Sequence, residues 1–179
     1  MRLSFAVLAV LAGLPGTPGF PSREEALDSI YPKGTVKVQS HWLSKEEIRK
    51  ASKLAGEPVG GVVREYRTTD GKGKLVGTAY VDVHKVRTKR QALLIAVSPA
   101  GILDGITVLG FAEPRDYLPR AKWFARFQGH RLNDQLRLRK GIDGVSGATL
   151  TSRATVSAAR RALAVQAVLA APPSPPPTP

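Results

Sequence analysis

The sequence contains no cysteine among its 179 residues. This absence excludes disulfide bonds, thiolate metal sites, iron–sulfur clusters, cysteine nucleophiles and a lipoprotein anchor. The three histidines, His41, His84 and His130, lie far apart and lack the spacing of metal ligands, so we expect no metal site. A dinucleotide fingerprint is also missing, because the Gly-x-Gly at residues 71–73 falls in an expected hairpin rather than at a strand–helix junction.

Acidic residues are scarce: the sequence has 14 Asp and Glu and 27 Lys and Arg, which gives a net charge of +13. Such an excess favours an anionic partner, whether nucleic acid, a membrane surface, an acidic protein or a phosphate-bearing cofactor. The basic residues are scattered, with local clusters at residues 85–90 and 137–140. Because no nucleic-acid reading module is recognisable, we expect no nucleic-acid partner. A basic binding module for other anionic polymers stays open as an alternative.

Long apolar runs are scarce too. Arg2 precedes one run, Leu3 to Leu14, whose roughly 12 residues fall short of the roughly 20 that cross a bilayer. A basic residue followed by such a run is typical of a secretory signal peptide, and an uncleaved anchor is the alternative. We therefore expect residues 1–20 to be a signal peptide or N-terminal anchor and the folded part to be periplasmic or otherwise extracytoplasmic, free or attached to the membrane through that segment.

Turn residues and periodicity predict an α+β fold for residues 21–171, a single domain with an antiparallel sheet of four or five strands flanked by helices. Asp70-Gly71-Lys72-Gly73 is a strong hairpin signal between two alternating segments. Residues 172–179 form a proline-rich tail that is neither helix nor sheet. The expected helices cover residues 22–31, 44–54, 119–128 and 151–171, and the expected strands lie near 36–38 and over 62–69, 75–84, 92–97 and 102–111.

The most informative segment is Asp143-Gly144-Val145-Ser146-Gly147-Ala148-Thr149, followed by Leu150-Thr151-Ser152-Arg153. Glycines, hydroxyl residues and an arginine gather where a helix is expected to begin. Glycine permits close backbone approach, and a helix N-terminus favours negative charge, so the pattern indicates a phosphate site. A simple turn with an N-cap is the alternative.

This segment resembles the D-x-x-[ST]-G-A-T signature of the FMN-binding domain family, which includes the C subunit of the sodium-translocating NADH:quinone reductase and the G subunit of the Rnf complex. Two upstream elements, residues 111–117 with Glu113-Pro114 and Tyr117, and residues 123–129, add to the likeness, which runs from about Glu24 to Leu163. The resemblance implies FMN joined through its phosphate to Thr149. It also implies a separate exported FAD:protein FMN transferase that attaches the flavin.

The resemblance assigns parts to further residues, all in a cofactor-binding rather than a catalytic role. Thr149 supplies the ester oxygen, Gly147 and Ala148 keep the approach open, and Asp143 either begins the motif that the transferase recognises or is a turn residue. Glu113 and Tyr117 either form a turn or contact the flavin, and the aromatic pair Trp123 and Phe127 either packs in the core or lines the flavin ring. Hydrogen bonds to the phosphate come from Ser146, Thr151 and Ser152, and charge neutralisation from Arg153.

These observations predict an exported electron carrier with covalent FMN, an electron-transfer protein more than a stand-alone enzyme. Its expected partners are the transferase, a membrane or periplasmic redox partner, and the membrane surface itself. The alternatives are a flavin-dependent reductase acting on its own small substrate and the basic binding module without flavin.

Overall fold

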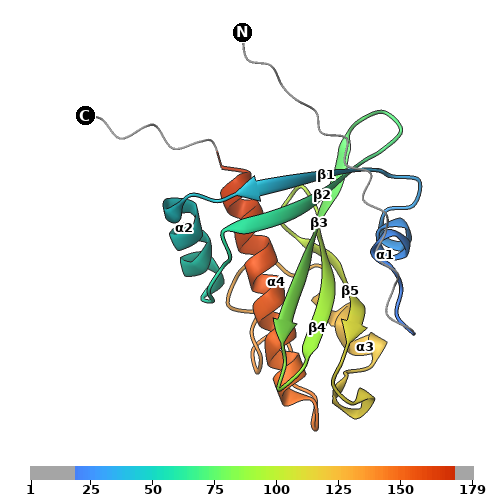
Figure 1. Ribbon diagram of the computed structural model, residues 1–179, viewed down its shortest axis with the longest axis vertical. Helices are drawn as coiled ribbons and strands as arrows, with labels where there is room; N and C mark the ends of the chain where they lie inside the picture. The colour runs from blue at the N-terminus through green and yellow to red at the C-terminus, as the bar shows by residue number, and fades with distance from the viewer. Residues whose placement is uncertain (1–18, 172–179) are drawn as a thin grey trace.

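The computed structural model describes residues 19–171 and confirms the α+β class: one five-stranded antiparallel sheet, in the order β1-β2-β3-β4-β5, is flanked by helices (Figure 1). The expected signal or anchor segment, but for residues 19 and 20, and the proline-rich tail lie outside the described residues. Within them, no helix is both long and apolar enough to span a bilayer. The elements are α1 (Arg23–Ile30), β1 (Thr35–Trp42), α2 (Lys45–Ala55), β2 (Val62–Thr69), β3 (Leu75–Lys85), β4 (Arg90–Val97), β5 (Leu103–Phe111), α3 (Ala121–Phe124) and α4 (Thr149–Leu169).

Local sequence signals explain the boundaries of the first elements. Ser22 and Ser44 each close a capping box with a glutamate three residues on, and these boxes begin α1 and α2. In the β2–β3 hairpin, Asp70 Oδ1 accepts hydrogen bonds from the N–H groups of Lys72 and Lys74, both at 2.9 Å. Gly73 has a φ of +80°, which glycine adopts without strain.

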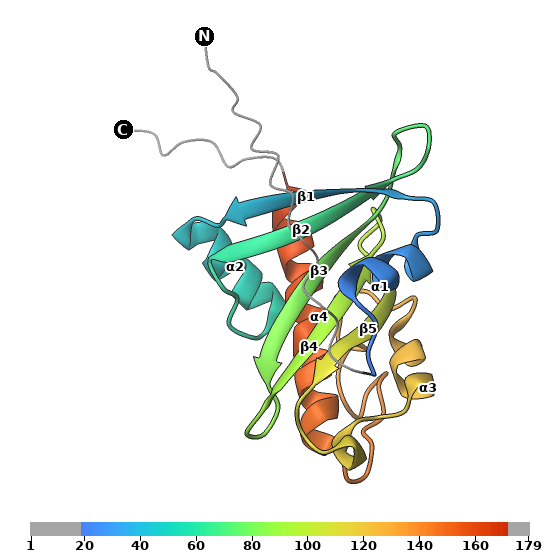
Figure 2. The same ribbon diagram turned by 45° about the vertical axis from the view of Figure 1, so that its right-hand side comes forward.

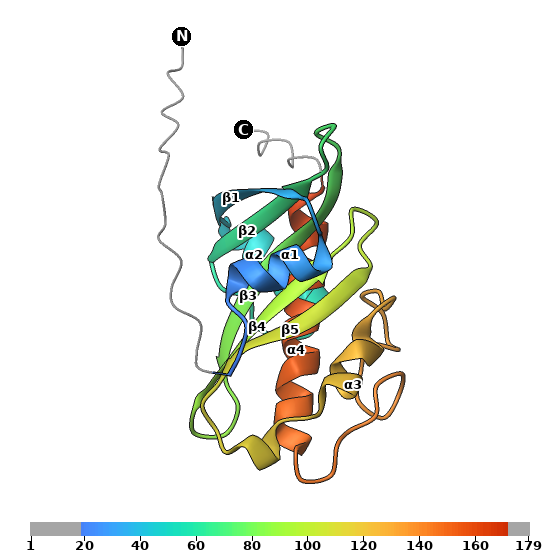
Figure 3. The same cartoon turned by 90° about the vertical axis from the view of Figure 1, so that its right-hand side faces the viewer.

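Both faces of the sheet are covered, as Figures 2 and 3 show. Along β3, Ala79 and Tyr80 point to opposite faces, as the alternation predicts. Ala79 belongs to a small cluster under α1, together with Leu27 and Leu94. Tyr80 belongs to the main core under α2, α3 and α4. Because α4 crosses β3, β4 and β5 on this second face, the sheet fixes the direction in which the helix begins.

Arg160 fastens the middle of α4 to its neighbours. Its guanidinium, 6% exposed, donates from Nε to the Ala55 carbonyl at 2.7 Å and from Nη1 to the Asn133 carbonyl at 2.8 Å. The Ala55 carbonyl lies at the C-terminal end of α2, where the helix dipole favours a cation. Arg161 adds a two-pronged ion pair with Asp82 of β3, at 2.9 and 2.8 Å. This part of α4 is therefore structural.

Candidate functional site

The N-terminus of α4 is the structural centre of the candidate site. Thr149 is the first residue of this helix, two residues earlier than the sequence predicts, and its side chain is exposed. Ala148 occupies the N-cap position and provides no side-chain hydrogen bond. The first N–H groups of any helix lack acceptors inside the helix. A 21-residue helix thus presents free donors and the positive end of its dipole beside a free hydroxyl.

The two small residues before Thr149 meet different requirements. Gly147 has a φ of +79°, a left-handed conformation that glycine adopts without strain, yet a Cβ added there meets no atom within 4 Å. The backbone, rather than crowding by the protein, therefore explains this glycine. Ala148 is 2% exposed, so a larger side chain has no room there. Whether either residue keeps the approach open for a phosphate stays a prediction.

The hydroxyls of Thr151 and Ser152 are engaged inside the protein. Thr151 is buried, and its Oγ1 donates to the Tyr117 carbonyl at 2.6 Å. Ser152 Oγ donates to the Ala148 carbonyl at 3.0 Å. Each hydroxyl can donate one hydrogen bond, and both hydroxyls, at the start of α4, already donate to backbone carbonyls. This arrangement gives no support to the prediction that these two residues donate to a phosphate, which stays untested, whereas the Ser146 side chain is exposed.

The loop that carries Asp143 is fixed by an aromatic cluster. Trp123 Nε1 donates to the Asp143 carbonyl at 2.7 Å, and Arg126 forms an ion pair with the Asp143 carboxylate at 2.5 Å. The Trp123 ring packs edge-to-face on Phe124 and Phe127, with centroids 5.1 and 5.0 Å apart. Trp123 and Phe127 are buried in the main core. Their position supports the packing interpretation, while the Asp143 side chain remains exposed.

Glu113 braces the turn between β3 and β4. Its Oε1 accepts hydrogen bonds from the N–H groups of Thr88, at 2.6 Å, and Lys89, at 2.7 Å. These backbone donors, Lys89 first, hold the pKa of the Glu113 carboxyl below its usual value. The carboxylate thereby fixes the turn beside the start of α4. The sequence shows this turn only as a basic cluster, and nothing local in it indicates the long-range contact with Glu113.

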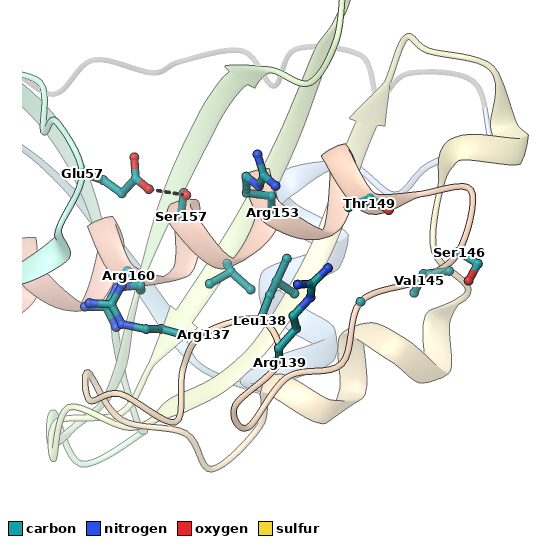
Figure 4. Close-up of a pocket in the computed structure, with 12 residues that line it drawn as sticks. Glu57, Arg137, Leu138, Arg139, Val145, Ser146, Thr149, Arg153, Ser157 and Arg160 are labelled. Carbon is teal, nitrogen blue, oxygen red and sulfur yellow. Dashed lines mark hydrogen bonds between the residues drawn. The ribbon is translucent and has the colours of Figure 1, made fainter.

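Thr149 lies between two cavities of different character. We call the larger the basic cavity; it has a volume of about 610 Å³, and Arg139 reaches into it toward α4 (Figure 4). The smaller, the Tyr117 cavity, has a volume of about 200 Å³. Thr149 lines both. The basic cavity is also lined by Glu57, Arg137, Leu138, Arg139, Gly144, Val145, Ser146, Arg153, Val156, Ser157 and Arg160, and the Tyr117 cavity by Val86, Arg87, Glu113, Tyr117, Gly147, Ala148, Leu150 and Thr151.

The arginines of the basic cavity differ in their availability. Arg137 is paired with Asp134 at 3.1 Å, and Arg160 is engaged with backbone carbonyls. The only lining carboxylate, Glu57, accepts a hydrogen bond from Ser157 at 2.8 Å. Within residues 19–171, the side chains of Arg139 and Arg153 have no hydrogen bond or ion pair. These two guanidinium groups are free to meet an anion next to Thr149.

The arrangement suits a phosphate ester with a large planar group attached. The free N–H groups of α4 and the guanidinium of Arg153 suit phosphate oxygens. Tyr117 and Leu150, 37% and 47% exposed, offer apolar surface at the Tyr117 cavity. The described residues contain no cluster of side chains able to hold a metal ion. The residues present thus fit FMN.

The comparisons with known proteins agree with this geometry. A family model described as an FMN-binding domain matches residues 60–164, which is more than half of the chain. The matched part runs from just before β2 into the second half of α4 and contains all ten residues predicted for the site, from Glu113 to Arg153. No curated protein and no solved structure matches the chain significantly.

Proposed function

This chain belongs to the FMN-binding domain family and is a flavin-binding electron carrier with FMN as its cofactor, and we propose that the FMN is joined through its phosphate to Oγ1 of Thr149. The observation that carries the proposal is the position of Thr149: an exposed hydroxyl on the first residue of α4, lining both cavities. FMN supplies one- and two-electron chemistry that side chains lack.

Each part of the site has a task toward the bound group. The N–H groups at the start of α4 and the Arg153 side chain hold the phosphate. Tyr117 and Leu150 offer apolar contact to the isoalloxazine ring. Glu113 acts indirectly, because it fixes the β3–β4 turn that forms one wall of the Tyr117 cavity. Asp143, whose side chain is exposed, serves recognition by the loading enzyme.

Attachment requires a second protein. A threonine hydroxyl is a weak nucleophile at neutral pH and needs a base or a metal ion to activate it. The carboxylate lining the Tyr117 cavity, Glu113, already accepts hydrogen bonds from Thr88 and Lys89. An FAD:protein FMN transferase supplies the missing groups together with Mg²⁺. Thr149 Oγ1 bonds to the flavin-side phosphorus of FAD, AMP leaves, and the hydroxyl proton passes to the base of the transferase.

The location and the partners belong to the same proposal. Arg2 and the apolar run behind it direct the folded part across the membrane, where a covalent bond keeps the cofactor from being lost. The carrier exchanges electrons with a membrane or periplasmic redox partner. Its net charge of +13 steers association with an anionic partner, so the electron-transfer rate falls as salt rises. A salt-independent rate would count against such steering.

One observation favours a second candidate, a flavin reductase with its own small substrate. The basic cavity, about 610 Å³, lies in the usual volume range of small-molecule sites. An anionic substrate bound there would meet Arg139 and lie beside Thr149. Turnover of small electron acceptors by the flavin-loaded protein, with no other protein present, would favour the reductase over the carrier.

The attachment is tested by hydroxyl deletion. Thr149→Ala removes the ester oxygen from an exposed position, so the protein folds and carries no covalent flavin. The matched control, Thr151→Ala, removes the next hydroxyl of α4, which is engaged with the Tyr117 carbonyl, and retains the flavin in the fraction that folds. Each variant is co-expressed with an FMN transferase, and flavin fluorescence is measured in the denatured band. A Thr149→Ala band as bright as the wild type would exclude the assignment.

A further inference from the structure

Positive charge is distributed unequally along this chain. Residues 1–84 contain 12 Lys and Arg against 9 Asp and Glu, whereas residues 85–179 contain 15 against 5. The second part includes the β3–β4 turn and the first turn of α4, which lie at the same end of the molecule in Figures 1 and 2. The part of the sequence that contains the site therefore carries most of the excess charge.

Three arginines from three segments surround Thr149 at this end. Arg87 comes from the β3–β4 turn and lines the Tyr117 cavity, while Arg139 and Arg153 line the basic cavity. All three are exposed, and within the part of the chain that the structure describes their side chains form no ion pair or hydrogen bond. Together with the half-exposed Tyr117 and Leu150, they form a surface that we call the Thr149 face.

The acidic residues near this face offer it little compensation. Glu113 is engaged with the N–H groups of Thr88 and Lys89, and Asp143 is paired with Arg126. Among the described residues near this face, two carboxylates outside ion pairs remain: Asp116, exposed in the 3₁₀ turn Arg115–Tyr117, and Glu57, which lines the basic cavity together with a fourth arginine, Arg160. A phosphodiester at Thr149 carries one negative charge, so it neutralises only one of the three arginines. The surplus suits a second anion.

We propose that the Thr149 face is the docking surface for an acidic redox protein, whose carboxylates reach Arg87 and Arg139 in the two cavities that Thr149 lines. The inference rests on the proposed function, because it gives the electron-transfer partner its chemistry. Arg87 and Arg139 belong to the walls of two concave sites, so they match side chains that protrude from a protein. A lipid surface is flat and lacks such protrusions. The planar fork of arginine also pairs with a carboxylate through two hydrogen bonds.

Docking on this face has a functional consequence. An apolar centre, where Tyr117 and Leu150 would hold the flavin ring, with charged arginines at the rim, matches the general anatomy of protein interfaces. Rim charges act mainly on the rate of association and on its salt dependence. The partner would therefore be brought to the flavin-bearing end of the molecule, where the distance for electron transfer is shortest.

The test compares two charge reversals of equal size. Arg87→Glu with Arg139→Glu changes the Thr149 face, and Lys37→Glu with Lys72→Glu changes exposed lysines of β1 and the β2–β3 turn. The probe is a short fluorescent oligoglutamate peptide at low salt. Flavin-free protein is used, so the result does not depend on attachment at Thr149. We expect the first pair to weaken binding by about tenfold and the second by less than about threefold.

Two further arms keep the result decisive. Arg87→Gln with Arg139→Gln removes charge without reversing it and should give an intermediate loss, with circular dichroism confirming the fold. Vesicles of phosphatidylcholine and phosphatidylglycerol in equal parts test the lipid surface as the other source of negative charge. Equal losses in the two Glu pairs, no peptide binding by the wild type, or a loss confined to vesicles would each overturn the proposal. Failure of the proposed function is read separately, from the loading gel, as flavin that Thr149→Ala retains.

Discussion

Arg153 and Arg160 lie two turns apart on α4 and both line the basic cavity, yet their surroundings are opposite. Arg160 is buried, and the carbonyls of Ala55 and Asn133 accept hydrogen bonds from its guanidinium. Arg153 is exposed and, among the described residues, has no partner. The protein thus uses the same residue type to hold α4 in place and to leave charge available at its N-terminal end. The groups available to bind an anion here are those that form no hydrogen bond or ion pair within the described residues.

The rest of α4 follows the same division. From Thr155 to Leu163 the helix packs through Val156, Ala159 and Leu163, the apolar stripe that the sequence predicts. The first turn exposes Thr149 and Leu150 instead. Substitutions in the buried part of α4 that follows Arg153 should change stability, whereas substitutions of the exposed residues Thr149 and Arg153 should change flavin loading.

The largest effect is expected at Arg160. Arg160→Met keeps much of the side-chain volume but leaves several buried carbonyls without donors, so the free energy of unfolding should fall by about 3 kcal/mol. Arg153→Met is the matched control and should change it by less than about 0.5 kcal/mol. Urea unfolding followed by circular dichroism measures both. Equal effects of the two substitutions would remove the distinction between the two ends of α4.

The ion pair between Asp82 and Arg161 of α4 should make the free energy of unfolding depend on pH. Burial opposes ionisation of its carboxyl, but hydrogen bonds from His84 and Arg161 outweigh burial and lower the pKa to about 2. Because this pKa lies below the usual value of 3.8, ionised Asp82 stabilises the fold above about pH 4, and the contribution is lost as the pH falls to about 2. The loss amounts to about 2 kcal/mol. In Asp82→Asn, the free energy of unfolding should fall less steeply between about pH 4 and about pH 2 than in the wild type. An unchanged slope would contradict the assignment.

A smaller, local effect is expected at Glu113. Glu113→Gln weakens the acceptor for the N–H groups of Thr88 and Lys89, because a neutral amide oxygen replaces a carboxylate. Hydrogen exchange of these two amides should accelerate severalfold while the amides of α4 keep their protection. Unchanged exchange at Thr88 would show that other contacts hold the turn.

The smallest effect is expected at Arg153. Arg153→Gln removes one charge-assisted hydrogen bond to the phosphate at an exposed position, so the loading rate should fall by roughly fivefold, equivalent to about 1 kcal/mol. Stability should be unchanged. The rate is followed by in-gel fluorescence over time with a limiting amount of transferase. Arg115→Gln, an exposed arginine outside both cavities, serves as the control and should load at the wild-type rate.

Much of the fold is predictable because it rests on local chemistry. Capping boxes at Ser22 and Ser44, the Asp70–Gly73 hairpin and alternation along β3 each depend on a few neighbouring residues. The site is predictable in part for a similar reason: the resemblance in residues 143–154 identifies the chemistry, and glycine at residue 147 fits the left-handed backbone observed there.

The remainder depends on contacts between distant segments. From the sequence we expect the Thr151 hydroxyl to cap the helix or to donate to a phosphate. In the structure it donates a hydrogen bond to the Tyr117 carbonyl, 34 residues away. The helix begins at Thr149, and the N-cap residue before it, Ala148, provides no side-chain hydrogen bond. Arg153 and Arg160 lie seven residues apart, on the same face of α4, and the packing of α2 against α4 separates their roles. Local sequence patterns identify residues able to bind a phosphate, while burial and long-range hydrogen bonds decide which of them remain available for binding.

The account is tested most directly by mass spectrometry of the protein purified from its native host. After denaturation and proteolysis, the peptide that contains Thr149 should carry the mass of one FMN less water, and fragmentation should place it on that threonine. The mass should be absent from Thr149→Ala protein expressed in the same host. A flavin that separates from the chain on denaturation, or a modification located on another residue, would contradict the central claim.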